Sequence, residues 1–165
     1  MVSLSEQFSP LINVDITCNV KRKGQSNVLI TKFEIKRDRN LALSLTNNQV
    51  TEIRGNELVV GSGYRFSKVK IGKIKIAGKP LESDLNCRVD LSIRNNATIT
   101  RKVVENQNQA TAGQQTISIK SSADYAINSK LTIRFFYDKV INRPVISTSF
   151  PTANTNSGIA IRFTL

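Results

Sequence analysis

Apolar and polar residues alternate with a period of two along most of this chain, and this pattern limits the fold more than any other feature. The segment DLNCRVDLSIR shows it most clearly. Leu85, Cys87, Val89, Leu91 and Ile93 fall on one side, and polar or charged residues fall between them. Successive side chains of a β-strand point to opposite faces, so the pattern predicts a strand with one apolar and one polar face.

The same alternation recurs in the other segments, and no segment sustains the 3.6-residue stripe of a helix. About eight strands are expected, with turn residues between them. They lie near residues 11–20, 28–37, 41–46, 57–66, 84–94, 115–125, 131–138 and 159–165. The segment RDRN is expected to form a tight turn and NNQVTEIRGN a polar loop. The fold predicted for residues 1–165 is therefore an all-β, antiparallel, up-and-down meander in a single segment.

Composition narrows the chemistry. The net charge is +12 and the chain has no histidine, which removes the commonest general base and the commonest metal ligand. Cys18 and Cys87 are far apart and not spaced like zinc ligands, so no metal site is predicted. By strand counting we expect two free thiols on the apolar face, Cys18 near the outer end and Cys87 near the periplasmic end.

Alternation alone fits two settings, a soluble sandwich or barrel with an apolar core and an outer-membrane barrel with an apolar outer surface. Strands of about ten residues favour the membrane, because a tilted membrane strand needs that length. The apolar side also carries no charge between the first and the last apolar residue of each predicted strand. The first residues lack the basic and apolar regions of a signal peptide, which indicates a cytosolic protein or a piece of a longer one.

The aromatic residues are expected at both ends of the predicted strands. Placing the C-terminus in the periplasm puts Tyr64, Phe66, Tyr125 and Phe163 at that end, and Phe135 and Tyr137 at the other. Membrane barrels carry aromatic girdles at both interfaces, so this distribution favours the membrane interpretation.

The membrane interpretation assigns each face a role. The lipid-facing residues are then Val89, Leu91, Ile93, Ile117, Ile119, Leu131 and Ile133. The lumen-facing residues are Arg65, Arg88, Asp90, Arg94, Lys120, Asp124 and Arg134, interpreted as paired or wetted charges. Gly61 and Gly63 are interpreted as relieving crowding on the inner face of a curved sheet.

The final segment, IAIRFTL, alternates up to its last residue. A barrel must pair its last strand with its first to remove the sheet edge. The barrel-closing strand is therefore expected to carry Ile159, Ile161, Phe163 and Leu165.

Several segments are specific enough to suggest a family. They are LSEQFSPLI, TEIRGNELVVGSGYRF, KPLESDLNCRVDLSIRNNATITRKV, GQQTISIKSSADYAINSKLTIRFFYD and ISTSFPTANTNSGIAIRFTL. Together they resemble the C-terminal end of the SprA family, also called Sov, the outer-membrane translocon of the type IX secretion system of Bacteroidetes. In some members this system is linked to gliding motility. Family members are many times longer, so the resemblance implies that this chain is a C-terminal part.

The resemblance implies a very large single-chain barrel at the cell surface that conducts folded cargo proteins, with no catalysis and no cofactor. The implied partners are the remaining N-terminal strands of the barrel, secreted cargo proteins, pore-capping subunits, the barrel assembly machinery and membrane lipid, and they include no nucleic acid. Localisation in the outer membrane follows from the same resemblance.

Two alternatives remain open on sequence alone. One is a free-standing eight-stranded outer-membrane barrel, a size that 165 residues would suit. The other is a soluble basic β-protein that binds a polyanion. The stretch SKVKIGKIKIAGK suits such binding, although it is interpreted first as a solvated edge ribbon whose lysines discourage aggregation.

Overall fold

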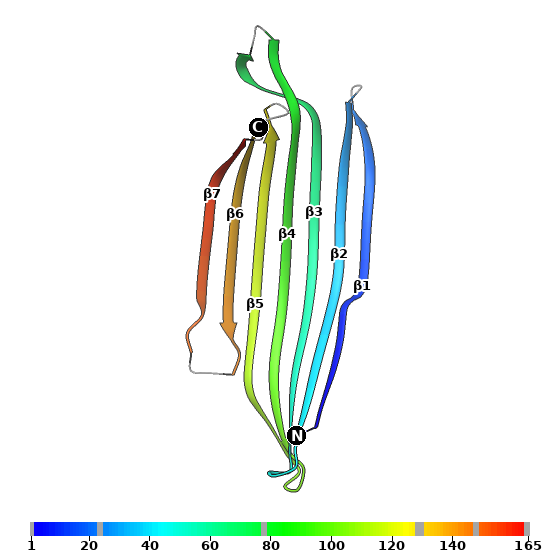
Figure 1. The fold of residues 1–165 in the computed structure, drawn as a ribbon, viewed down its shortest axis with the longest axis vertical. Coiled ribbons are helices and arrows are strands. Elements are labelled where there is room, and N and C mark those ends of the chain that lie inside the picture. The colour runs from blue at the N-terminus through cyan, green and yellow to red at the C-terminus, as the bar shows by residue number, and fades with distance from the viewer. Residues whose placement is uncertain (1, 23–24, 77–78, 128–130, 147–148, 164–165) are drawn as a thin grey trace.

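One antiparallel sheet of seven strands makes up the fold (Figure 1). The computed structural model describes residues 2–22, 25–76, 79–127, 131–146 and 149–163. The strands are β1 (Val2–Arg22), β2 (Gln25–Ser44), β3 (Gln49–Ile76), β4 (Lys79–Lys102), β5 (Gln107–Ala126), β6 (Leu131–Pro144) and β7 (Thr152–Phe163). Each strand pairs with the next along the chain, which confirms the all-β, up-and-down prediction. The sheet is open, with β1 and β7 at its edges, and no helix in the described ranges is long and apolar enough to span a membrane.

The number of strands differs from the expected eight, because the segment RDRN does not turn. β2 runs straight through it, and Asp38 pairs with Gly55 of β3. The segment contains neither glycine nor proline, and Arg94 of β4 neutralises Asp38 at 2.8 Å. A charged stretch whose charges find partners on neighbouring strands can stay extended, so two predicted strands are one.

The real turns lie further along. The residues predicted as a polar loop belong mostly to β3, and the β2–β3 turn occupies residues 45–48. Asn48 there has φ 50°, and Asn106 at the same position of the 103–106 turn has φ 49°. Asparagine tolerates this left-handed conformation better than most residues, which is why both four-residue hairpins close on it.

Connections fall at two ends of the sheet. The turns at 45–48 and 103–106 lie at one end, here called the hairpin end, and the backbone amide of Val103 donates to the Asn48 carbonyl at 3.0 Å. At the other end β3 and β4 continue beyond their neighbours as a two-stranded ribbon, with Ile76 paired to Lys79, as the sequence suggested (Figure 1). We call this the ribbon end.

The sheet has no apolar core of its own. Among the residues that the structure describes, only Tyr125 is a buried hydrophobic, with 4% of its surface exposed. Many large apolar side chains are instead exposed, such as Val89 at 51% and Ile161 at 70%. A sheet with an exposed apolar face must cover it with something else, either another layer or lipid.

Candidate functional site

The two faces of the sheet differ sharply in chemistry. We call the face that carries Leu91 and Ile119, which pair directly across β4 and β5, the apolar face. The face that carries the neighbouring pair Asp90 and Lys120 is the polar face. The register places every residue predicted to face lipid on the apolar face, and every residue predicted to face the lumen on the polar face.

An uncharged band crosses the apolar face on all seven strands. It comprises the residues of that face within 12–20 of β1, 29–35 of β2, 58–66 of β3, 85–93 of β4, 117–125 of β5, 131–137 of β6 and 159–163 of β7. Its centre is occupied by Val89, flanked by Ser62 and Ser121. From Ile12 to Val20 the band measures about 27 Å along the strand, or about 21 Å across the band for strands tilted by about 40°.

The band follows one row of paired residues at its hairpin-end edge from β1 to β5, and this edge shifts only on β6 and β7. On β5 this edge lies at Ile117. On β6 it lies at Tyr137, four residues closer to the ribbon end, and on β7 it lies at Ile159, two residues closer again. The next residue of that face on β6 is Lys139, which marks the edge with a charge. Five strands therefore end the band in one row, and the last two end it closer to the ribbon end.

Most aromatic side chains of the band gather toward its ribbon end. Tyr64 and Phe135 share one row of paired residues, and Phe66 and Tyr125 share the next. The prediction that Phe135 and Tyr137 lie at the opposite end from Tyr64 is therefore wrong, because β6 continues to Pro144, past its predicted end at 138, and both residues lie in its first half. One aromatic girdle is present, near the ribbon end.

The positions of the two cysteines along their strands also differ from the prediction. Both are free thiols and both lie on the apolar face, as expected. They are not at opposite ends, because Cys18 pairs with Leu29, Leu29 with Tyr64, and Tyr64 with Cys87 in a single row. Two strands lie between them, which keeps the thiols well beyond disulfide distance.

Charges on the polar face are mostly paired. Arg134 contacts Asp124 at 3.0 Å, and Arg88 donates to its strand neighbour Asp90 at 2.6 Å. Arg65 pairs with Asp84 on β4 at 2.5 Å. A hollow of about 480 Å³ brings together four of the predicted lumen residues, Arg88, Asp90, Lys120 and Arg134. The polar face is thus a charged, largely compensated surface suited to contact with water.

The two glycines singled out in the sequence behave differently. A methyl group on Gly61 would collide with the Asp90 carboxylate, so this glycine does relieve crowding on the polar face. At Gly63 the nearest atom, the Cys87 carbonyl oxygen, would lie at 3.7 Å, which is ordinary contact distance. The crowding prediction holds for the first glycine only.

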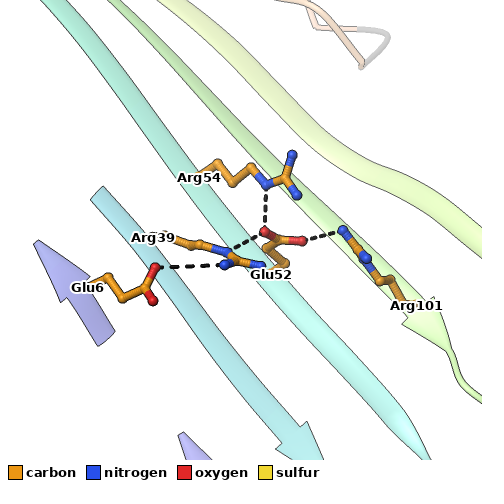
Figure 2. A network of polar contacts seen from close by, with 5 residues as sticks. All are labelled: Glu6, Arg39, Glu52, Arg54 and Arg101. Atoms are coloured by element: carbon orange, nitrogen blue, oxygen red, sulfur yellow. Dashed lines mark hydrogen bonds and ion pairs between the residues drawn. The ribbon is translucent and has the colours of Figure 1, made fainter. Parts of the chain in front are cut away.

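Beyond the band, toward the hairpin end, the apolar face carries a network of charges (Figure 2). Glu52 of β3 is fully buried and accepts hydrogen bonds from Arg39 at 2.7 Å, Arg54 at 2.5 Å and Arg101 at 2.6 Å. Arg39 also reaches Glu6 of β1 at 3.7 Å, so the network joins four strands.

This network alters the acidity of its central residue. The hydrogen bonds from Arg54 and then Arg39 lower the pKa of Glu52 to about 2, against burial, which acts in the opposite direction. The carboxylate therefore stays ionised at neutral pH and holds three guanidinium groups around it. The Nε atom of Arg101 is buried without an acceptor.

Sequence reasoning missed this network, because its residues fell in a predicted turn and a predicted loop. The alternation of Val50, Glu52 and Arg54 with Thr51 and Ile53 was the available signal. Because Glu52 and Arg54 are charged, a search for apolar periodicity does not detect this alternation.

The expected closing strand is β7, an edge of the open sheet. Ile159, Ile161 and Phe163 lie on its apolar face and are exposed, and Leu165 is outside the described residues. A scan of protein-family models finds none that matches this chain, and a search of the curated proteins finds no significant match.

Proposed function

We propose that this chain is part of the wall of an outer-membrane β-barrel that conducts proteins, with its apolar face against lipid and its polar face toward the lumen. The observation that carries the proposal is the uncharged band, which crosses seven strands on one face while paired charges occupy the other. The band is about as tall as the apolar belt of outer-membrane barrels, which measures about 25 Å.

The edges of the sheet support a wide barrel over a free-standing eight-stranded one. Seven strands of an eight-stranded barrel curve until the first and last nearly meet. In the described part of this chain β1 and β7 do not contact each other. Unpaired backbone groups at a sheet edge cost several kcal/mol each in lipid, so both edges require further strands, which the rest of a larger barrel would provide.

The specific role rests on the segments that resemble the SprA family. On that basis the chain contributes its strands to a type IX secretion translocon at the cell surface, and the polar face lines the path of secreted cargo. The partners are then the remaining strands, the cargo, pore-capping subunits, the barrel assembly machinery and lipid. Neither a cofactor nor catalysis enters this proposal, and in gliding organisms the translocon would serve motility.

Adjacent residues of β4 offer a direct test. Leu91→Arg places a charge in the band, and Ser92→Arg places the same charge on the polar face beside Glu57, which Ser92 contacts at 2.6 Å. In the full protein that carries this chain, Leu91→Arg should reduce both outer-membrane abundance and cargo secretion, and Ser92→Arg should retain them. Equal tolerance of the two substitutions would contradict the lipid-facing assignment.

Loss of cargo secretion with normal membrane abundance is the readout specific to the translocon role. Replacing Lys120, which lies in the polar hollow, by Glu should leave abundance unchanged while altering secretion. A barrel that assembles normally and secretes every cargo at an unchanged rate after several such charge reversals would be a membrane barrel without a conducting role for this wall.

A further inference from the structure

The apolar face becomes basic as soon as the band ends toward the hairpin end. On four strands the first charged residue beyond the band is a cation, namely Arg37, Arg54, Arg101 and Lys139. On β1 it is Glu6, which already lies within 3.7 Å of Arg39. The side that is proposed to face lipid therefore presents positive charge where hydrocarbon would give way to headgroups.

The heights of Arg37, Arg39 and Arg54 match a headgroup layer, whereas Arg101 lies eight residues beyond the band edge at Ile93. Two successive residues span about 7 Å along a strand, or about 5 Å along the membrane normal at a tilt of about 40°. Arg37 lies two residues beyond Ile35, and Arg54 lies four residues beyond Leu58. The headgroup region adds roughly 5–8 Å to each side of the hydrocarbon, within reach of both side chains.

The guanidinium groups keep donors free for a ligand. Glu52 occupies one nitrogen each of Arg39, Arg54 and Arg101, and every guanidinium has five N–H donors. Arg54 and Arg101 are 40% and 42% exposed, and Arg37 has no ion-pair partner in the part of the chain that the structure describes. Four guanidiniums thus face only two carboxylates, those of Glu6 and Glu52.

The arrangement is also preorganised. One buried carboxylate draws three guanidiniums from three adjacent strands together (Figure 2). Because arginine forks match the oxygen atoms of phosphate, a fixed group of them recognises phosphate better than isolated surface cations do. A carboxylate ligand, which has only two oxygen atoms, would use fewer of these donors.

We propose that Arg37, Arg39 and Arg54 bind the phosphate groups of a lipid headgroup in the leaflet at the hairpin end, and that Arg101 holds Glu52 from the side away from the band. The inference rests on the proposed function, because it takes the apolar face to contact lipid. Long extensions beyond the membrane are typical of the extracellular side of outer-membrane barrels, which makes the outer leaflet the source of this lipid. At the hairpin end β1 to β5 all run on beyond the band, as residues 37–44 of β2 do, whereas at the ribbon end only β3 and β4 continue as a two-stranded ribbon.

The test uses the full protein that carries this chain, extracted from outer membranes in detergent and freed of lipid. Binding of lipid A with both phosphates is compared with binding of dephosphorylated lipid A by native mass spectrometry. Arg37→Gln combined with Arg54→Gln should weaken binding of the phosphorylated lipid by about tenfold or more, since each lost charged hydrogen bond contributes on that scale. Binding of the dephosphorylated lipid should not change.

Two further variants keep the result interpretable. Arg37→Gln alone removes a side chain that makes no ion pair in the described structure, so it should fold normally and still weaken binding. Lys36→Gln removes one positive charge at the adjacent position. The Lys36 side chain lies on the polar face of the sheet, 3.7 Å from Glu34. This control should bind the phosphorylated lipid as the unmodified protein does.

Three outcomes would overturn the inference. The double variant could bind the phosphorylated lipid as tightly as the unmodified protein, the loss could be equal for both lipids, or inorganic phosphate could bind as tightly as the lipid. A protein that resists alkaline carbonate extraction yet shows one of these outcomes retains the proposed function and refutes the lipid site alone. Release of the protein by carbonate would refute both.

Discussion

β3 has two parts, the band at residues 58–66 and an extension toward the hairpin end at residues 49–56. On the same face of the sheet, the two parts differ in which side chains are buried. In the band, Leu58 and Val60 stay exposed and have no partner layer among the described residues. Six residues from Leu58, Glu52 is fully buried among Arg54 of its own strand and Arg39 and Arg101 of the neighbouring strands. The extension pairs its buried carboxylate with these arginines, whereas the apolar side chains of the band are exposed to the surrounding medium. The comparison indicates that the two parts are built for different surroundings.

The largest effect is expected from placing a charge at two different positions on the apolar face of β4, one inside the band and one beyond its edge. Val89→Arg places a charge at the centre of the band, and Asn95→Arg places it on the same face of β4 beyond the edge. We expect losses of about 2–4 kcal/mol and about 0–1 kcal/mol of folding free energy respectively. Refolding into lipid vesicles measures both. Equal losses would mean that the band and the extension share one environment.

The arginine network should matter next. Glu52→Gln removes the carboxylate that holds three guanidiniums together and should destabilise the extension by about 1–3 kcal/mol. Glu105→Gln is the control, because its pair with Lys102 is exposed at 2.8 Å and should contribute less than about 1 kcal/mol. Limited proteolysis of the hairpin end gives the measurement. If the two variants are digested equally fast, Glu52 does not organise the extension.

A pH titration sharpens the same point. The pKa of Glu52 falls from an ordinary 4.5 to about 2 in the folded protein, so its contribution to stability is complete above pH 4.5 and is lost as the pH falls toward 2. Protease resistance of the extension should therefore be constant between pH 7 and about 5 and decline below that. Glu52→Gln should remove this component of the decline, and a variant that keeps the whole decline would assign it to other groups.

The smallest effect concerns glycines of the polar face, which runs through both parts. Added methyl groups would collide with Asp38 at Gly55, in the extension, and with Asp90 at Gly61, behind the band. Each change to alanine should destabilise the sheet by about 1 kcal/mol, and Gly63→Ala, which has room, should not. Thermal unfolding in detergent compares the three. A larger loss at position 63 than at 61 would contradict the packing described here.

The fold was largely predictable because its signal is local. Alternation in DLNCRVDLSIR and its neighbours assigned the strands and, with them, the face on which each candidate residue lies. Chain order then gave the meander, since short connections join neighbouring antiparallel strands. Only the side on which a residue lies was needed, and period two supplies it.

The arginine network and the strand ends were not predictable in the same way. RDRN was assigned to a turn on composition, although its charges pair with residues such as Arg94, more than fifty positions away. One wrongly inserted turn reversed the assumed direction of every strand before it. That reversal placed Cys18 at the wrong end relative to later strands, while leaving its face correct.

The most direct test of the central claim measures which face meets lipid. Spin labels are placed singly at positions 85–93 of β4 in the full protein in lipid bilayers, and their collisions with oxygen and with a water-soluble nickel chelate are compared. The account predicts that labels at Val89 and Leu91 collide with oxygen and those at Asp90 and Ser92 with nickel, alternating along the strand. High nickel accessibility at Val89 and Leu91 would contradict it.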